Sequence, residues 1–290
     1  EKGSYRIYGQ KIYITYGEHD LSENIIHLVL ARLPDAPAGT RGISLFLAPK
    51  FLADDAGGLT RHNDIRCVGL EHKLGIHGSP TCTMSFGDTQ GATAYLIGEE
   101  NNGLACMFTM MNNARLSVGI QGVALAERAT QMALAYALER KQGRALGAKA
   151  TSSIIDHPDV MRMLLTMASL TGAARSICFE TAASLDRASR EKDPIKAKAA
   201  FERASLLTPI AKAFSSDIAN ETTSLGVQIF GGMGYIEETG AAQLMRDARI
   251  CAIYEGANGV QAIDLTMRKI LLSEGIIVEN ELKDMDKIAQ

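Results

Sequence analysis

Residues 103–140 read GLACMFTMMNNARLSVGIQGVALAERATQMALAYALER, and this stretch decides the class of fold. Apolar and small residues recur in it at helical spacing, and no proline occurs between positions 81 and 157. The spacing predicts one long amphipathic helix that runs to about Arg140. Its apolar stripe consists of Met107, Met111, Ala114, Val118, Gly122, Leu125 and Ala129.

The sequence after this helix predicts more helices. Proline is favoured at the first helical position, so helices are expected to begin at Pro158 and, after Asp193, at Pro194. Pro209 is expected to kink or interrupt the second of these. Another helix is expected beyond Thr239, and a last one through residues 260–272. Together they predict a helical bundle over residues 99–274, followed by a polar tail at 275–290.

The sequence before the helix is typical of β structure. Residues Tyr5–Thr15 alternate around Gly9-Gln10, which predicts a hairpin. Residues 1–98 are therefore expected to form a β domain, a barrel or a sandwich, and the chain as a whole to be a multi-domain α+β protein. The other expected strands are Ile25–Ala31, Gly42–Ala48, Ile65–Val68, Thr81–Phe86 and Ala92–Ile97.

Composition excludes several classes of protein. The 290 residues carry 30 Lys+Arg against 33 Asp+Glu, a net charge of −3 without a basic stripe, which argues against nucleic-acid binding. A hydrophobic content of 46% excludes disorder as the main state. No apolar run reaches about eighteen residues, so no transmembrane helix is expected. The five cysteines and six histidines lack the spacing of a disulfide framework or a metal site. A cytoplasmic protein without a metal is expected.

Gly231-Gly232-Met233-Gly234 is the first candidate for chemistry. A helical, alanine-rich segment precedes it and the spacing is not G-x-G-x-x-G, so it is not a nicotinamide site of the Rossmann type. Glycines let backbone N–H groups point at an anion such as pyrophosphate. A turn that ends a helix explains the same residues, and the sequence leaves both interpretations open.

Glu255 is the candidate for acid–base chemistry. It lies in Ile253-Tyr254-Glu255-Gly256-Ala257-Asn258-Gly259, which interrupts the helical periodicity. A carboxylate at such a junction suits a general base if it faces a cavity, because partial burial raises its pKa. An ordinary surface carboxylate in a loop fits the pattern equally well.

Three other places also allow a functional and a structural interpretation. Arg140 suits a phosphate contact, although a cation at a helix C-terminus explains it more simply. Tyr13 and Thr15 share one face of a strand end and suit either a planar cofactor or a β core. Asn112 and Arg115 lie one helical turn apart and suit either a polar capture site or a buried network.

These segments, taken in order over residues 5–272, resemble the acyl-CoA dehydrogenase family. The sequence at Gly17-Glu18-His19-Asp20 and at residues 42–47 is similar to that of a longer bacterial branch of the family, which includes methylthiopropionyl-CoA dehydrogenases. The matching segments are residues 9–15, Lys73-Leu74-Gly75-Ile76, Ala114-Arg115-Leu116, residues 136–140, Gln228 to Gly234, Met245-Arg246-Asp247-Ala248 and Ile253 to Asn258.

The resemblance implies a fold and a reaction. The fold is a middle β-barrel domain followed by a four-helix bundle, with FAD between them. The reaction is α,β-dehydrogenation of an acyl-CoA thioester, as in fatty-acid β-oxidation. Glu255 takes the α-proton while the β-hydride passes to flavin N5. The electrons then go to an electron-transfer flavoprotein, and the enzyme is a homodimer or homotetramer.

The resemblance also implies site residues by position. Tyr13, Ile14 and Thr15 match the strand against the flavin, and Ala257 a cofactor contact. Arg140 and Gln142 match residues that reach the FAD pyrophosphate from a neighbouring subunit. Gly231 and Gly232 match the loop near the adenosine end. Asn112, Arg115, Tyr254 and Gly256 match positions near the bound acyl-CoA.

The chain departs from the family pattern in four respects. Tyr13 stands where tryptophan is frequent, Ala257 replaces a common threonine, and Gly143 directly follows Gln142 where many members have an aromatic residue. The match begins inside the β domain, so the chain is expected to lack the family's N-terminal helical domain and to bind acyl-CoA poorly by itself. The alternative functions are an acyl-CoA oxidase that uses oxygen and a catalytically silent scaffold or binding relative.

Overall fold

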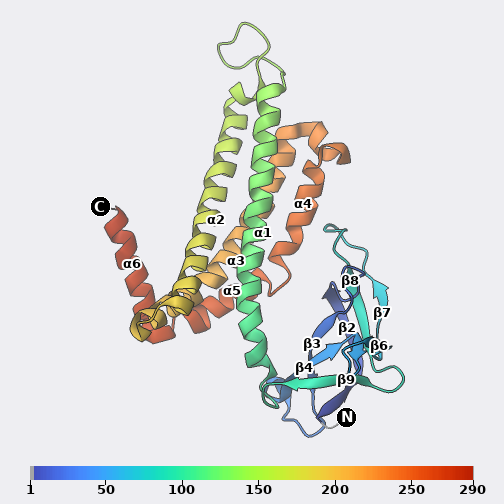
Figure 1. Cartoon of the computed structure of the whole chain (residues 1–290). Coiled ribbons are helices and arrows are strands. Elements are labelled where there is room, and N and C mark those ends of the chain that lie inside the picture. Colours follow the sequence, from blue (N-terminus) through green and yellow to red (C-terminus); the bar gives the residue numbers. More distant parts are fainter. Residues whose placement is uncertain (1–2, 290) are drawn as a thin grey trace. The chain divides into compact units, whose positions relative to one another are not determined.

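The chain forms two compact units. The computed structural model describes residues 3–289, except for the side chains of Thr60 and Leu272. One unit extends to Met111 and the other begins at Asn112 (Figure 1). Strands make up most of the first unit, and α1 (Gly103–Glu139) begins in it and continues into the second. The domain boundary expected at residue 98 falls between the last strand and α1, and as a domain limit it stays a prediction.

Two antiparallel sheets form the β unit. One has the order β1 (Ser4–Ile7), β9 (Ala92–Ile97), β4 (Ile43–Pro49), β3 (Ile26–Arg32), and the other the order β2 (Gly9–Thr15), β8 (Thr81–Phe86), β7 (Ile65–Leu70). A short pair, β5 (Phe51–Ala53) and β6 (Leu59–His62), lies outside both and was not predicted. Ile7, Val29 and Phe46 from the first sheet pack with Ile65 and Met84 from the second. The core therefore lies between the two sheets.

The hairpin predicted for Tyr5–Thr15 is wrong. β1 pairs with β9, whereas β2 pairs with β8, so the two strands belong to different sheets. The extended segment crosses from one sheet to the other at Tyr8 and completes an edge of each. Both pairing partners come from beyond residue 80, so the local alternation contained no information about them.

Three long helices and a short fourth one make up the bundle of the second unit. They are α1, α2 (Pro158–Arg190), α3 (Pro194–Phe230) and α4 (Ala241–Arg249). The starts predicted at Pro158 and Pro194 are confirmed, and the Asp193 carboxylate caps α3 by accepting from the backbone N–H of Ile195 at 2.9 Å. Pro209 lies inside α3 without dividing it, so the helix is not interrupted there, and the alternative of a kink stays a prediction.

Small residues bring α1 close to α3. A Cβ atom on Gly122 would lie 2.6 Å from the carbonyl oxygen of Ser215, and one on Gly119 would lie 2.9 Å from that of Ala211. Glycine is therefore required at both contacts. Leu116, Val123, Ala174, Ala211 and Ile218 form a core shared by α1, α2 and α3. This close approach positions the middle of α3 beside the first half of α1.

The end of the chain differs from the expectation. The segment expected as one helix over 260–272 consists of α5 (Asn258–Asp264), a π-helical turn (Leu265–Lys269) and the start of a 3-10 turn (Leu272–Gly275). Residues 276–289 of the expected tail form a further helix, α6 (Ile276–Ala289). Ile277 is buried, and Arg203 of α3 forms an ion pair with Glu281 of α6. These contacts attach α6 to the bundle.

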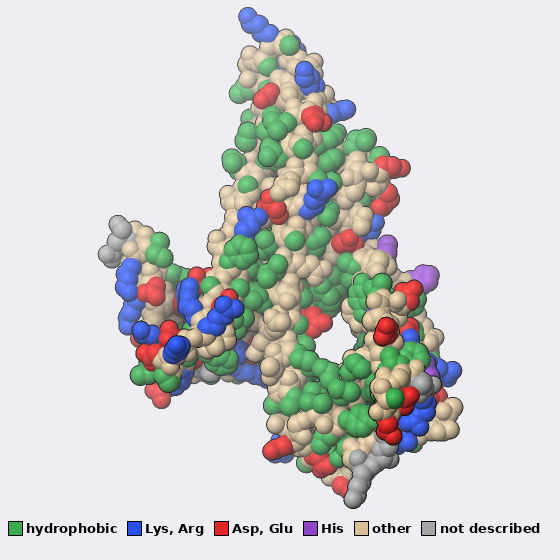
Figure 2. Space-filling view, in the orientation of Figure 1, with side chains coloured by type: hydrophobic (Ala, Val, Ile, Leu, Met, Phe, Trp, Pro, Cys, Tyr) green, Lys and Arg blue, Asp and Glu red, His purple; other side chains and the backbone are tan. Residues whose placement is uncertain are grey.

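The predicted fold class, a β part followed by a helical domain, is confirmed. None of the helices within residues 3–289 is long and apolar enough to span a bilayer. Apolar side chains nevertheless remain exposed along the helices, as the space-filling view illustrates (Figure 2). Leu165 and Phe179 on α2 are among them, with exposures of 59% and 62%.

Candidate active site

A strained loop carries Glu255. We call residues Ile253–Asn258, which connect the 3-10 turn Ile250–Ala252 to α5 and include its first residue, the Glu255 loop. Glu255 has a φ of 53° and Gly256 a φ of 89°, so two successive residues are left-handed. This conformation is uncommon for a residue with a side chain, and it persists only where surrounding contacts hold it. This enforced conformation makes Glu255 a candidate for a functional residue.

The contacts that hold the loop come from three helices. The Tyr254 hydroxyl donates to Oε1 of Gln121 on α1, and burial raises the pKa of Tyr254 to about 12. Gln261 of α5 donates through Nε2 to the Gly256 carbonyl at 3.0 Å. A Cβ atom on Gly256 would lie 2.6 Å from that nitrogen, so a larger residue would have to displace the Gln261 amide. Asn258 supplies the third attachment, to α3.

Lys212 lies directly behind the loop, and sequence reasoning missed it. This α3 residue is fully buried, and its Nζ donates to Oδ1 of Asn258 at 2.9 Å. Burial lowers the pKa of Lys212 to about 8. A lysine in an alanine-rich helix is usually exposed, so its pattern did not distinguish it from its solvated neighbours. Only packing against the loop identifies it.

Arg115 takes part in a buried ion pair. Its Nη1 lies 3.0 Å from Oδ2 of Asp264 at the end of α5, and both side chains are 7% exposed. Its Nη2 would lie 3.9 Å from a Cβ atom on Gly256, so the guanidinium is beside the loop. Of the two sequence interpretations, the structure favours the buried network for Arg115. Asn112, one turn earlier, is half-buried on the same helix.

The Glu255 carboxylate differs from the groups around it in its hydrogen bonding. The residue is half-buried, and neither its carboxylate nor its backbone N–H has a hydrogen-bond partner among residues 3–289. The neighbouring residues, in contrast, are all attached by the bonds described above. A fixed loop with one free acceptor and one free donor is suited to a substrate that supplies a proton and a carbonyl oxygen.

A second group of predicted residues lies at the other end of α1. We call Arg140, Gln142, Gly231 and Gly232 the Arg140 end. The Tyr136 ring, one turn before Arg140, stacks on Phe230 with ring centroids 4.3 Å apart. Phe230 immediately precedes Gly231, so this stack brings the two parts together. Arg140 and Gln142 are exposed, with Arg140 Nη2 3.4 Å from Gln142 Oε1.

The glycines of the Arg140 end are open. Gly231 has a φ of 61°, and a Cβ atom on Gly231 or Gly232 would have nothing within 4 Å. A helix ends at Gly231, as the turn interpretation expects, and the backbone there is approachable, so the anion interpretation stays a prediction. An exposed guanidinium beside an open glycine backbone is suited to a phosphate or pyrophosphate.

The two groups are far apart within one chain. Arg115 lies on α1 and Arg140 directly follows its last residue, 25 positions later, which corresponds to about 37 Å at the rise of an α-helix. Ala257, predicted as a cofactor contact, is exposed on the Glu255 loop, whereas Arg140, Gln142, Gly231 and Gly232 lie at the opposite end. The structure thus does not bring the predicted cofactor residues of the helical unit together.

The remaining predicted cofactor residues belong to the β unit. Tyr13, Ile14 and Thr15 end β2, an edge strand. The pairing with β8 shifts between Lys11 and Ile14, and Tyr13 within this bulge has a φ of 59° and is 69% exposed. Bulges often redirect a side chain next to a functional site. Tyr13 therefore does not belong to the β core.

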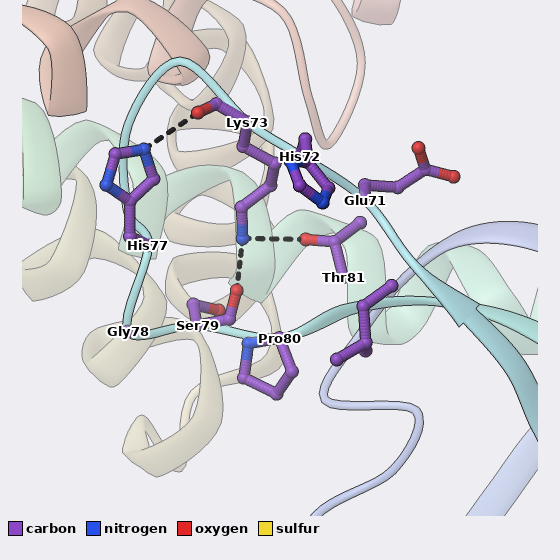
Figure 3. A pocket seen from close by; sticks show the side chains of 9 residues that line it. Glu71, His72, Lys73, His77, Gly78, Ser79, Pro80 and Thr81 are labelled. Carbon is purple, nitrogen blue, oxygen red and sulfur yellow. Dashed lines mark hydrogen bonds between the residues drawn. The ribbon is translucent and has the colours of Figure 1, made fainter.

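The β unit also contains a cavity that sequence reasoning did not predict. It measures about 490 Å³ and lies at the loop between β7 and β8 (Figure 3). Lys73 Nζ donates to the Ser79 carbonyl and, at 3.0 Å, to Thr81 Oγ1, so it closes this loop. His77 Nε2 lies 2.7 Å from the Lys73 carbonyl. These contacts give the Lys73–Ile76 motif a role in shaping the loop.

Comparison with known proteins gives a consistent result. Residues 101–270 match the family model described as acyl-CoA dehydrogenase, C-terminal domain. The chain is 54% identical over 278 residues to a 3-methylmercaptopropionyl-CoA dehydrogenase of Ruegeria pomeroyi, which covers 95% of this chain and 46% of that relative. The chain thus spans about half the length of the curated relative.

Two solved structures share the fold. Caenorhabditis elegans ACDH-11 in complex with C11-CoA has a TM-score of 0.81 and 27% identity, over 98% of this chain and 45% of that one. A chain of the structure described as electron transferring flavoprotein of Acidaminococcus fermentans has a TM-score of 0.74 and 30% identity, over 94% and 62%. With its fold, its motifs and more than half of its length matched, this chain belongs to the acyl-CoA dehydrogenase family.

Proposed function

We propose that this chain carries the catalytic base of an FAD-dependent enzyme that dehydrogenates an acyl-CoA thioester to the trans-2-enoyl-CoA. The observation that carries the proposal is Glu255, a half-buried carboxylate without a hydrogen-bond partner among residues 3–289, on a loop held in a left-handed conformation. Both the activity and its substrate class are proposals, since the chain spans only 46% of its relative.

Glu255 provides two groups that the reaction needs. Its carboxylate accepts the α-proton of the thioester. That proton is weakly acidic until the thioester carbonyl is polarised, and the free backbone N–H of Glu255 is available as a donor to the carbonyl oxygen. Tyr254 and Gly256 flank the base, and their bonds to Gln121 and Gln261 keep both groups aimed in fixed directions.

The Arg140 end fits part of an FAD molecule. Arg140 and Gln142 would meet the pyrophosphate, with Gly231 and Gly232 near the adenosine, because their open backbone admits an anion closely. Tyr13, Ile14, Thr15 and Ala257 would contact the flavin side. When bound, FAD accepts the electron pair of the β-hydride. The fit of the Arg140 end to FAD rests on the exposed guanidinium of Arg140 and on the open space around Gly231 and Gly232.

The separation of the two groups supports an oligomer. About 37 Å along α1 exceeds what one dinucleotide spans, so the Arg140 end is expected to serve the FAD of another subunit. Exposed apolar side chains on α2 are consistent with contact to a second copy. We therefore propose a homodimer or homotetramer, in which each site combines residues from two chains.

Electron-transfer flavoprotein is the proposed acceptor of the electrons. The Acidaminococcus structure described above supports this choice by its description. The oxidase and the silent scaffold are less favoured, because the named relative is a dehydrogenase and a carboxylate is present at the position of the base. The cytoplasmic location stays a prediction.

An anaerobic titration tests the proposal. Full-length protein is mixed with a panel of acyl-CoAs, and bleaching of the flavin absorbance is followed. We expect Glu255→Gln to abolish bleaching, by at least about 10³-fold in rate, while FAD stays bound, because a neutral amide cannot accept the proton. Glu238→Gln is the matched control, since Glu238 is an exposed carboxylate in a 3-10 turn of the same unit.

Each outcome decides between the candidates. Bleaching of Glu255→Gln at the wild-type rate would mean that the base lies elsewhere. A preparation without flavin absorbance would contradict FAD dependence. Reoxidation of the bleached protein by oxygen at the rate of turnover would favour the oxidase, whereas slow reoxidation with rapid transfer to electron-transfer flavoprotein would favour the dehydrogenase.

A further inference from the structure

Lys212 is the most unusual buried group in the helical unit. It is fully buried in the middle of α3, although lysine is almost never found so unless it is paired. The dehydrogenation proposed above assigns it no part. Removing an ammonium from water is costly, so a compensating interaction is required at this position.

That interaction is with the start of α5. Lys212 Nζ donates to Oδ1 of Asn258, the last residue of the Glu255 loop, at 2.9 Å. The Asn258 amide nitrogen in turn donates to Oδ1 of Asp217 at 2.7 Å, to Ser216 Oγ at 2.9 Å and to the Ala213 carbonyl at 3.2 Å. Every bond of Asn258's side chain therefore goes to α3, and Lys212 is its only cationic donor among residues 3–289.

Charged and titratable groups surround Lys212 from four elements. Asp217 comes from its own helix, Cys251 from the 3-10 turn before the loop, Arg115 from α1 and Glu255 from the loop itself. Burial lowers the pKa of Lys212 to about 8, and Asp217, Cys251 and Glu255 oppose this shift. Burial also raises the pKa of the Cys251 thiol to about 11, so that thiol stays neutral at pH 7.

We propose that Lys212 is a positioning residue for Glu255. Its ammonium holds the Glu255 loop against α3 through the bond to Asn258. The inference rests on the proposed function of Glu255. Lys212 does not touch the substrate and transfers no proton.

The charge distinguishes this role from simple packing. A buried ammonium destabilises the fold relative to an apolar side chain of similar size, so a residue kept only for packing would gain from losing the charge. Below pH 8 the ammonium is charged and the loop is held. As the pH rises through about 8 the charge is lost, and the hold on Asn258 weakens.

The stability of the folded chain is expected to change with pH in the opposite direction to the order of the loop. The pKa of Lys212 is lower in the folded chain than its ordinary value of 10.5, so the unfolded chain binds more protons between pH 8 and 10.5. Lys212 therefore makes the folded state more stable as the pH rises through this window, while the loop becomes less ordered. A role in packing alone does not produce this opposition.

Hydrogen–deuterium exchange of the Glu255 loop in the full-length protein tests the proposal. We compare Lys212→Met with Lys198→Met, the same substitution at an exposed position of α3. Loss of a charged hydrogen bond is expected to speed exchange of the loop amides about tenfold at pH 7. The melting temperature is expected to stay the same or rise, and flavin bleaching to slow. Lys198→Met is expected to behave like the wild type.

The outcomes are decisive even if one variant misfolds. Wild-type exchange in Lys212→Met would overturn the proposal. If that variant does not fold, Asn258→Ala breaks the same link, and wild-type exchange there would equally overturn it. Where both fold, the double variant is expected to exchange no faster than Asn258→Ala alone, because Asn258→Ala already removes the bond to Lys212. Failure of the proposed function shows instead as normal bleaching by Glu255→Gln, while the exchange result stands.

Discussion

The two ends of α1 hold the predicted site residues in opposite environments. At the Glu255 loop, the side chains of Arg115 and Asp264 are buried, and three helices fix the backbone. At the Arg140 end, the cation is exposed and the glycines face open space. The difference is one of preorganisation, because contacts within the chain fix the first end and leave the second open. In the proposed function, the first end would serve proton transfer and the second would be a contact surface for the cofactor.

Replacing arginine by methionine at each of the two ends is expected to give the largest difference in stability. Arg115→Met leaves Asp264 buried with Arg268, at 3.6 Å, as its only cationic partner in the described part of the chain, so we expect a loss of about 3 kcal/mol in the free energy of unfolding. Arg140→Met, just beyond the end of α1, is expected to change it by less than about 0.5 kcal/mol, because Arg140 is exposed. Denaturant unfolding of both variants measures this. Equal losses of stability would contradict the difference in burial between the two ends.

Replacing Gly256 and Gly231, which both have a positive φ, by alanine is expected to give a smaller difference in stability. Gly256→Ala must displace Gln261 Nε2 and so break its bond to the Gly256 carbonyl, with an expected cost of about 2 kcal/mol. Gly231→Ala meets no atom within 4 Å, so only the left-handed backbone opposes it, at about 1 kcal/mol. Thermal unfolding compares the two, and a larger loss at Gly231 would contradict the interpretation of its surroundings.

The smallest expected effect is on the cofactor. Arg140→Met is expected to weaken FAD binding about tenfold, because one charge-assisted bond to a pyrophosphate is lost. The flavin absorbance left after gel filtration measures retention, and Lys149→Met, in the loop that follows α1, is the control. Unchanged retention would mean that the Arg140 end does not meet the cofactor.

Sequence reasoning succeeded where the signal is local. Helical spacing and two prolines predicted α1, α2 and α3, because each helix satisfies its own backbone and depends little on distant partners. It failed at Tyr5–Thr15, where strand partners come from beyond residue 80. The sequence also predicted Arg115 and Glu255 as site candidates. It did not predict Lys212 or Asp264, because charged residues in a helix usually lie on its solvated face.

The sequence by itself determined the class of fold, the family motifs and the position of the candidate base. Periodicity and motif order are properties of neighbouring residues, so they can be recognised in the linear chain. Only the tertiary structure decided that Lys212 is buried behind Glu255, that Arg115 pairs with Asp264, and that the Arg140 end lies a helix length away. Burial and charge pairing depend on what packs against a residue, and that partner comes from 40 or more positions along the chain.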